Sequence, residues 1–254
     1  MPNKPPTETG ILHAVVVSDL HIGLPFFRKS AFLKLIESLD AETTLILNGD
    51  IVDNPYQRLL PEDEAILNHL RKQSFERRVI WIYGNHDEDF RMSDPGQIEF
   101  SRNLALGTRL MIIHGDDFDT IMPNNRWFIR FFKFCHRFRL RLGADPVHVA
   151  ELAKRWAPLL YRVLTEQVKK NAIDCALQGN FGAITCGHTH YAEDFSDKGV
   201  RYINTGSWTE EPLHYLSVSA NDIRLLAYNH VLPEALQTEN SRARSSNEVL
   251  EAQI

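Results

Sequence analysis

Five short polar motifs, each following an apolar run, contain the side chains of this sequence best suited to chemistry. They are Asp19-x-His21, Gly49-Asp50-x-x-Asp53, Gly84-Asn85-His86-Asp87, His114-Gly115-Asp116 and Gly187-His188-Thr189-His190. One such motif alone usually means a turn, but five together offer carboxylate and amide oxygens with imidazole nitrogens. This donor set without thiolate predicts a site for two divalent metal ions, Mn²⁺ foremost, with Fe or Zn²⁺ as alternatives.

The expected reaction follows from the charge of such a site. A carboxylate has two oxygens and can bridge two cations, which is the role expected of Asp50. Two divalent ions held with Asp19 and Asp50 leave the site positively charged, so a phosphate group is the expected guest. Two metal ions can activate a bridging hydroxide for attack on phosphorus and neutralise the phosphoryl oxygens. The motifs therefore predict hydrolysis of a phosphoester or diphosphate bond.

The apolar runs before the motifs predict buried strands, because they are short, rich in Val, Ile and Leu, and end in Gly, Asn or Asp. They cover residues 11–18, 43–48, 79–83, 109–113 and 183–186. At a strand end, residues i and i+2 point the same way, so Asp19 with His21 can direct two donors into one cleft. Helices are expected over 25–39 and 61–75, and further strands over 200–203, 213–218 and 223–228. This alternation indicates an α/β fold with its site at strand ends.

Composition sets the frame for these elements. The chain has 254 residues, of which 43% are hydrophobic and 24% charged, as expected for one globular domain. A net charge of −5 argues against a generally basic nucleic-acid binder, so no nucleic-acid partner is expected. Three cysteines without a C-x-x-C spacing predict buried thiols in a reducing cytoplasm. No signal peptide or spanning segment is predicted, and the sequence does not indicate an oligomeric state.

The domain is expected over residues 11–232, with a disordered N-terminus (1–10) and a disordered tail (233–254). The long interval between the fourth and fifth motifs predicts a helical insertion over 123–179. Its second helix is expected to run from Asp145-Pro146 to Gly179, with a kink at Pro158.

The first helix of the insertion, residues 125–142, is predicted to be amphipathic, with aromatic side chains on one face and basic ones opposite. A cap packed on the body, with solvated arginines outside, is one interpretation. Attachment to an anionic membrane surface, or a cleft for acyl chains, is the other. One arginine falls within the aromatic face and needs a substrate phosphate or an internal carboxylate as its partner. The candidate substrate or membrane contacts are Arg126, Trp127, Phe131, Phe132 and Arg139.

The five motifs resemble those of the calcineurin-like metallophosphoesterases over about residues 11–230. The resemblance implies two packed mixed β-sheets flanked by helices, a four-layer αββα fold with the site above the strand ends. It also implies two ligand sets that share Asp50. One comprises Asp19, His21, Asp50 and His190, and the other comprises Asp50, Asn85, His114 and His188. In this family pattern His86 faces the substrate as general acid or phosphate ligand, and Asp87 is hydrogen-bonded to it.

Two further aspartates are expected to support ligands rather than to contact metal. Asp53 either orients a ligand or fixes its loop, and Asp116 is a candidate support for its neighbour His114. The segment 204–207 resembles a family segment that lines the site, or it is only a turn. Histidines outside the motifs are expected to be ordinary surface or core residues.

Within the family, the helical insertion resembles that of the UDP-2,3-diacylglucosamine pyrophosphohydrolases of lipid A synthesis. This resemblance implies a phosphorylated lipid-nucleotide substrate and a cytoplasmic protein, peripheral on the inner face of the cell membrane. The best-known members of that group have Arg where this chain has His86. The phosphoprotein-phosphatase branch fits worse, because its Gly-Asp-x-x-Asp-Arg-Gly motif ends here in Asn54-Pro55.

Three functions therefore remain open. Cleavage of the diphosphate bond of a UDP-diacylglucosamine-like lipid nucleotide is the leading prediction. The first alternative is a phosphodiesterase or phosphatase that acts on soluble or nucleic-acid substrates. The second is a non-catalytic, metal-bound scaffold recruited to membranes by its basic helix.

Overall fold

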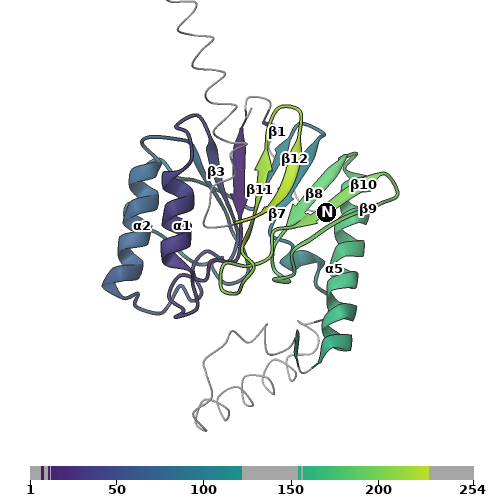
Figure 1. Ribbon diagram of the computed structural model, residues 1–254, viewed down its shortest axis with the longest axis horizontal. Coiled ribbons are helices and arrows are strands. Elements are labelled where there is room, and N and C mark those ends of the chain that lie inside the picture. The colour runs from purple at the N-terminus through teal and green to yellow at the C-terminus, as the bar shows by residue number, and fades with distance from the viewer. Residues whose placement is uncertain (1–6, 9–10, 12, 122–153, 156, 229–254) are drawn as a thin grey trace, which may run out of the picture.

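The computed structural model describes residues 7–8, 11, 13–121, 154–155 and 157–228 of the chain. These residues form two six-stranded mixed sheets that pack face to face, with helices on the outer face of each (Figure 1). The arrangement confirms the four-layer αββα fold.

The first sheet has the strand order β12-β11-β2-β3-β4-β5. Its strands are β2 (Ala14–Val17), β3 (Thr44–Asn48), β4 (Val79–Ile82), β5 (Glu99–Ser101), β11 (His214–Val218) and β12 (Ile223–Ala227). The run from β2 to β5 is parallel, and β11 pairs antiparallel with both β2 and β12. Strands β2, β3 and β4 are buried throughout, as expected of apolar runs covered on both faces.

The second sheet has the order β1-β6-β7-β8-β10-β9. Its strands are β1 (Thr7–Glu8), β6 (Asn103–Leu106), β7 (Leu110–Ile113), β8 (Ala183–Cys186), β9 (Glu193–Asp197) and β10 (Val200–Asn204). Strands β7, β8 and β10 are parallel neighbours. Residues 7–8 lie in the expected disordered N-terminus, yet they pair with β6. The rest of that segment, and the tail 233–254, lie outside the described residues.

Three apolar clusters hold the layers together. Between the sheets, side chains such as Ile46 of β3 meet side chains such as Ile112 of β7. Helices α1 (Lys29–Glu37) and α2 (Pro61–Gln73) cover the outer face of the first sheet, where Phe32 and Trp81 belong to one cluster. Helix α5 (Pro158–Gln178) covers the second sheet, and Val168 packs there. This packing therefore holds the ends of the parallel strands of both sheets in defined positions.

Several helix boundaries differ from the prediction, since α1 spans Lys29–Glu37 rather than 25–39 and α5 has a different start. Helix α5 begins at Pro158 instead of kinking there, and Ala157 before it is non-helical. Proline is well suited to the first position of a helix, where its missing N–H removes no hydrogen bond. Residues 154–155 are helical, but the predicted helix 125–142 and the helix start at 145–146 lie outside the described residues. So do the candidate contacts Arg126, Trp127, Phe131, Phe132 and Arg139.

None of the helices in the described part of the chain combines the length and the apolar character needed to cross a lipid bilayer. Among the described residues, Cys186 is a buried free thiol and Cys175 a half-buried one.

Candidate metal centre

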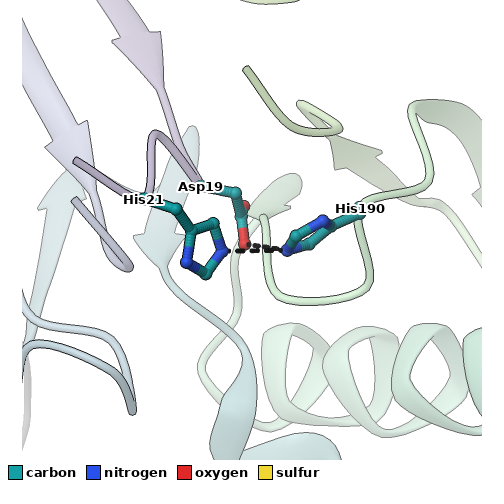
Figure 2. A group of neighbouring side chains, drawn as sticks. All are labelled: Asp19, His21 and His190. Atoms are coloured by element: carbon teal, nitrogen blue, oxygen red, sulfur yellow. Dashed lines mark hydrogen bonds and ion pairs between the residues drawn. The ribbon is translucent and has the colours of Figure 1, made fainter. Parts of the chain in front are cut away.

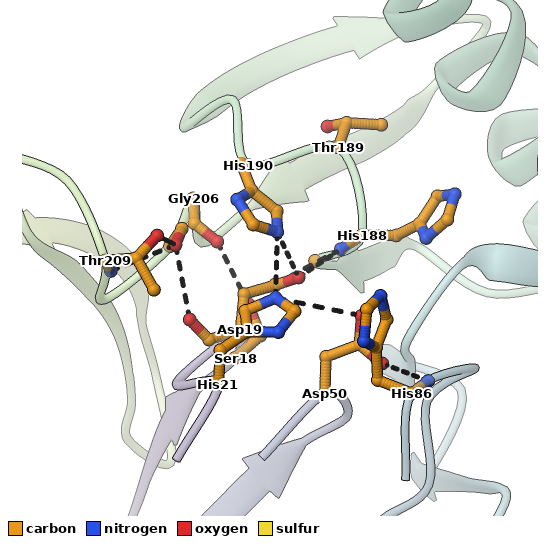
Figure 3. A network of polar contacts seen from close by, with 12 residues as sticks. Ser18, Asp19, His21, Asp50, His86, His188, Thr189, His190, Gly206 and Thr209 are labelled. Atoms are coloured by element: carbon orange, nitrogen blue, oxygen red, sulfur yellow. Dashed lines mark hydrogen bonds and ion pairs between the residues drawn. The ribbon is translucent and has the colours of Figure 1, made fainter. Parts of the chain in front are cut away.

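All seven predicted ligands lie at the ends of central strands of the two sheets. Strands β2, β3 and β4 lead into the loops of Asp19, Asp50 and Asn85, and β7 and β8 lead into those of His114 and His188. Among the described residues, three groups of side chains place their ligand atoms within 4.8 Å of one another. These are Asp19 with His21 and His190, Asp50 with His114 and His188, and His21 with Asp50 and His86. Figure 3 shows the first and third of these groups.

The backbone at these ligands is in a conformation that side chains rarely adopt. Positive φ angles between 49° and 61° occur at Asp19, His21, Asp50, His188 and His190. Such residues cost of order 1–3 kcal/mol each and cluster where function requires them. Backbone hydrogen bonds hold two of them, from the Asp19 N–H to the Gly49 carbonyl and from the His21 N–H to the Asp50 carbonyl, both 3.0 Å. The ligand loops are therefore fixed before any metal ion binds.

Two motif glycines let these loops approach closely. A Cβ atom at Gly187 would lie 2.2 Å from Oδ2 of Asp19, and one at Gly84 would lie 2.4 Å from Oδ1 of Asp50. Only glycine fits where backbone lies directly against a ligand carboxylate.

The first ligand group is drawn in Figure 2, where Asp19, His21 and His190 point toward one another. Nε2 of His190 lies 3.2 Å from Oδ1 of Asp19 and 3.1 Å from Nε2 of His21. Nδ1 of His21 lies 2.9 Å from the Asp53 carboxylate, and because a carboxylate only accepts, the ring nitrogen donates. The prediction that Asp53 orients a ligand is thus the geometry observed, and the lone pair on Nε2 of His21 points into the group.

The second group tests whether these residues fit a metal ion. Nδ1 of His114 donates to the Asn48 carbonyl at 2.9 Å, so Nε2 carries the lone pair of the neutral ring. That Nε2 is buried, has no hydrogen-bond partner among the described residues, and lies 3.2 Å from Oδ2 of Asp50. Two acceptors that face each other require a cation between them. A proton can fill this place, and a divalent ion would displace it.

Burial and nearby charges shift the pKa values of these groups. Burial lowers the pKa of His114, but the Asp50 carboxylate outweighs it and holds the pKa well above its ordinary value. Burial raises the pKa of Asp50 and of Asp19, but the adjacent rings of His114 and His190 bring both below their ordinary values. Both carboxylates are therefore ionised and available as ligands.

His188 and Asn85 complete the second group. Nδ1 of His188 lies 3.1 Å from Oδ1 of Asn85, while its Nε2 lies 3.1 Å from Oδ2 of Asp119. The Asp119 carboxylate accepts the Nε2 hydrogen, which leaves the lone pair on Nδ1 directed at Asn85. Again two acceptors converge, as they would around a metal ion. The set implied by the resemblance, Asp50 with Asn85, His114 and His188, therefore fits a divalent cation.

His86 is held by a different aspartate from the one expected. Its Nδ1 donates to the Asp53 carbonyl at 2.8 Å and lies 3.3 Å from the Asp53 carboxylate. Burial lowers the pKa of His86, but hydrogen bonding to Asp53 and the charge of Asp50 raise it to about 9. The His86 side chain is 38% exposed, whereas that of His114 is fully buried. His86 is thus the most accessible imidazole of the centre.

The predicted hydrogen bond between Asp87 and His86 is wrong. The Asp87 carboxylate accepts from the backbone N–H groups of Ile51 (2.8 Å) and Gly84 (2.7 Å) and from the indole of Trp81 (3.0 Å). The side chain therefore points into the protein, away from the substrate side, and burial raises the pKa of Asp87 to about 6. Asp87 thus joins the loops after β3 and β4.

Asp116 also has a different position from the one expected. The hydrogen bond that orients His114 is donated by its Nδ1 to the Asn48 carbonyl, and Asp116 takes no part in it. Gly115, with φ of 104°, turns the chain, and Asp116 begins the short 3₁₀ helix η1 (Asp116–Phe118). Its negative charge contributes to the raised pKa of His114, but it makes no hydrogen bond to that ring.

The segment 204–207 lies against the backbone of the ligand loops. Asn204 donates to the Gly187 carbonyl at 2.6 Å, and Ser207 donates to the Asp19 carbonyl at 3.2 Å. Ser18, next to Asp19, shares a hydrogen bond with Thr205 at 2.7 Å. Of the two interpretations, the one in which this segment lines the site agrees with these contacts.

Residues 12–192 match the sequence profile of the family described as Calcineurin-like phosphoesterase. The chain belongs to this family. A calcineurin-like phosphoesterase is a hydrolase that acts on phosphoester bonds with divalent metal ions, which agrees with the paired ligand groups.

This calcineurin-like phosphoesterase is also similar to two curated proteins and to a solved structure. It is 24% identical over 241 residues to the DNA polymerase II small subunit of Thermoplasma acidophilum, covering 79% of this chain and 46% of that protein. It is 24% identical over 238 residues to the corresponding subunit of Methanothermobacter thermautotrophicus, covering 77% and 47%. The chain thus spans about half the length of these relatives. The structure of a cold-active protein-tyrosine phosphatase from a Shewanella species superimposes with a TM-score of 0.49 at 14% identity, covering 89% of this chain and 81% of that one.

Four residues that support the centre were missed by the sequence reasoning. They are Asn48, Asp119, Lys154 and Tyr161. Asp119 lies three residues after Asp116, and this acidic stretch next to His114 could have pointed to it as a support of the centre. No motif marked the others, because each meets the centre only through the fold.

Proposed function

We propose that this calcineurin-like phosphoesterase hydrolyses phosphodiesters whose leaving group is an alkoxide or a phenoxide. The observation that carries this proposal is the placement of His86, an accessible imidazole beside Asp50 whose Nδ1 is fixed by Asp53. With Nδ1 occupied, Nε2 is the ring atom that faces the substrate. There it can donate a proton to the oxygen that leaves phosphorus.

Divalent ions held by the two ligand groups would neutralise the phosphoryl oxygens and activate water. The protein's own residues do the rest. Asp53 orients His21 and His86 together, and Asp50 accepts the His86 backbone N–H at 2.8 Å, so the acid and the metal ligands keep one geometry. An alkoxide is a strong base and gains from protonation as it departs, by typically about 10²- to 10⁴-fold. The departing phosphate of a diphosphate is a weak base and needs that proton far less.

A second candidate keeps the leading prediction from the sequence. The basic and aromatic pattern of residues 125–142 favours a lipid-nucleotide diphosphate as substrate, with the protein on the anionic inner face of the cell membrane. That helix lies outside the described residues, so its support is the sequence pattern alone. Mn²⁺ remains the proposed metal in both cases, because the ligands are oxygens and imidazoles.

Both candidates can be tested in one assay series. Mn²⁺-loaded protein is offered phenyl and p-nitrophenyl phosphodiesters, short DNA, and UDP-diacylglucosamine in mixed micelles. His86→Ala should slow hydrolysis of the phenyl ester by about 10²- to 10⁴-fold and that of the p-nitrophenyl ester less, because p-nitrophenol is the better leaving group. His13→Ala, an exposed histidine outside the motifs, is the control and should leave both rates unchanged.

Equal slowing of the two esters by His86→Ala would contradict the role of general acid. Release of UMP from UDP-diacylglucosamine, without turnover of any diester, would replace the first candidate by the second.

A further inference from the structure

The loop of residues 187–190, here termed the histidine loop, carries His188 and His190 and is held by side chains from elsewhere in the chain. Asp119 contacts it from one side of the segment 122–153, and Lys154 and Tyr161 contact it from the other. The two ends of that segment therefore meet at one loop of the metal centre. Figure 1 shows the start of α5 close to the strand ends.

Asp119 acts on the ring of His188. The Asp119 side chain is almost fully buried, and Oδ2 accepts the Nε2 hydrogen of His188 at 3.1 Å. Its other oxygen accepts the backbone N–H of Ile121 at 2.9 Å, which fixes the carboxylate in turn. A carboxylate that holds one ring nitrogen sets which nitrogen carries the lone pair and raises the basicity of a metal-binding histidine. Here it keeps Nδ1 of His188 directed at Asn85 and Asp50.

Lys154 and Tyr161 act on the backbone of the same loop. The Tyr161 hydroxyl donates to the Thr189 carbonyl, and the Lys154 ammonium donates to the His190 carbonyl at 2.6 Å. Lys154 also pairs with Glu210, and its ammonium lies 5.5 Å from the centroid of the Tyr161 ring. Two consecutive carbonyls are thus occupied by donors from outside the loop.

These contacts oppose the strain in the histidine loop. His188 and His190 have φ angles of 61° and 54°, which place their rings on the metal side but are unfavourable for residues with a Cβ. A loop released at the Thr189 and His190 carbonyls can relax toward ordinary φ values. The rings would then leave the positions in which they face Asp19 and Asp50.

We propose that Asp119, Lys154 and Tyr161 are positioning residues that set the affinity of the centre for the metal ions bound by His188 and His190. The inference rests on the metal-dependent function proposed above and adds that the two ends of the segment 122–153 are tied to metal binding. A purely structural role would change the stability of the apoprotein instead.

The test measures Mn²⁺ and Zn²⁺ binding to the full-length apoprotein by titration calorimetry, together with the thermal unfolding midpoint of the apoprotein. The variants are Asp119→Asn, Asp119→Ala, Lys154→Met and Tyr161→Phe. The control is Lys198→Met, the same change at an exposed lysine that pairs with Asp174 of α5. Loss of a side chain that holds a metal ligand typically weakens binding by about 10- to 100-fold.

We expect losses in that range, larger for Asp119→Ala than for Asp119→Asn, because asparagine can still accept the His188 hydrogen. The apoprotein midpoint should stay within a few degrees of wild type, and the control should bind as wild type does. Wild-type affinity in all variants would overturn the inference, as would affinity lost only in proportion to lost folding.

Failure of the proposed function looks different. A wild-type protein that binds Mn²⁺ but hydrolyses no phosphodiester overturns that function and leaves the positioning role standing. A wild-type apoprotein that binds no divalent ion overturns both.

Discussion

The two sheets contribute different chemistry to the centre. Loops after β2, β3 and β4 supply both carboxylate ligands, the amide and one imidazole, whereas loops after β7 and β8 supply only imidazoles. In both described groups an oxygen from the first sheet faces a nitrogen from the second, as Asp19 faces His190 and Asp50 faces His114. The third group, His21 with Asp50 and His86, lies on the first sheet alone, but each of these two groups needs both sheets, so the packing of the sheets is itself part of the site.

The two halves also differ in what supports them. On the first sheet the supports lie in the motifs themselves, since Asp53 orients His21 and Asp87 joins the loops after β3 and β4. On the second sheet the supports lie outside the five motifs, as with Asn204 on the Gly187 carbonyl and Tyr161 on the Thr189 carbonyl. The first half is supported by motif residues, and the second by residues that the fold brings to it from other segments.

The largest effect is expected where the two halves share a ligand. Asp50→Asn keeps an acceptor for the His86 backbone N–H but removes the charge that faces both His114 and His21. Loss of a residue that only supports a ligand weakens metal binding by up to about 100-fold. Asp50→Asn should weaken Mn²⁺ binding by more than this. Titration calorimetry and metal analysis after gel filtration measure it, with Asp197→Ala on exposed β9 as control. Retention of two ions at wild-type affinity would show that Asp50 is not shared.

This division explains what could be predicted from the sequence. The candidate metal ligands could be named from the sequence because each follows a buried strand, and parallel strands bring their ends to one edge. The same reasoning could not find Lys154 or Tyr161, because no motif surrounds either residue and a lone lysine or tyrosine carries no signal of what it will contact. Such residues are defined by which loop the fold places beside them.

The direction of a side chain was the other property that the sequence could not predict. The sequence places Asp87 next to His86, and adjacency was taken for contact. In the structure the tight turn after Gly84 sends the Asp87 carboxylate inward to three N–H groups, while Asp53 from another loop reaches His86. Local spacing predicts which residues share a loop, but the hydrogen-bond donors buried beneath that loop decide which way each side chain points.

An intermediate effect is expected from forcing the two halves apart. In Gly187→Ala the new Cβ would lie 2.2 Å from Oδ2 of Asp19 and 2.5 Å from Oγ of Ser18, so the histidine loop must shift. Overpacking of this kind costs about 1–3 kcal/mol of unfolding free energy. The shift should also weaken Mn²⁺ binding by about tenfold or more, within the range known for displaced ligands. Urea denaturation and calorimetry measure the two effects.

Gly182→Ala is the matched control for that change. Its added Cβ would meet nothing closer than 3.6 Å, so neither stability nor metal binding should fall appreciably. If Gly187→Ala behaved like this control, the close contact between the two halves would not matter for the metal centre.

The smallest effect on hydrolysis is expected for Asp87→Ala, although Asp87 lies beside two site residues. Three buried N–H donors lose their acceptor in this variant. Each unsatisfied donor costs about 1–3 kcal/mol, and because water can replace part of the lost bonding, the free energy of unfolding should fall by about 3 kcal/mol. Well below the unfolding midpoint, the hydrolysis rate should fall by less than about tenfold, the equivalent of 1.4 kcal/mol. Asp89→Ala, an exposed change in the same loop, should alter neither quantity. A rate that dropped a hundredfold at unchanged stability would mean that Asp87 acts through His86 after all, and that the first sheet's half depends on that contact rather than on Asp53.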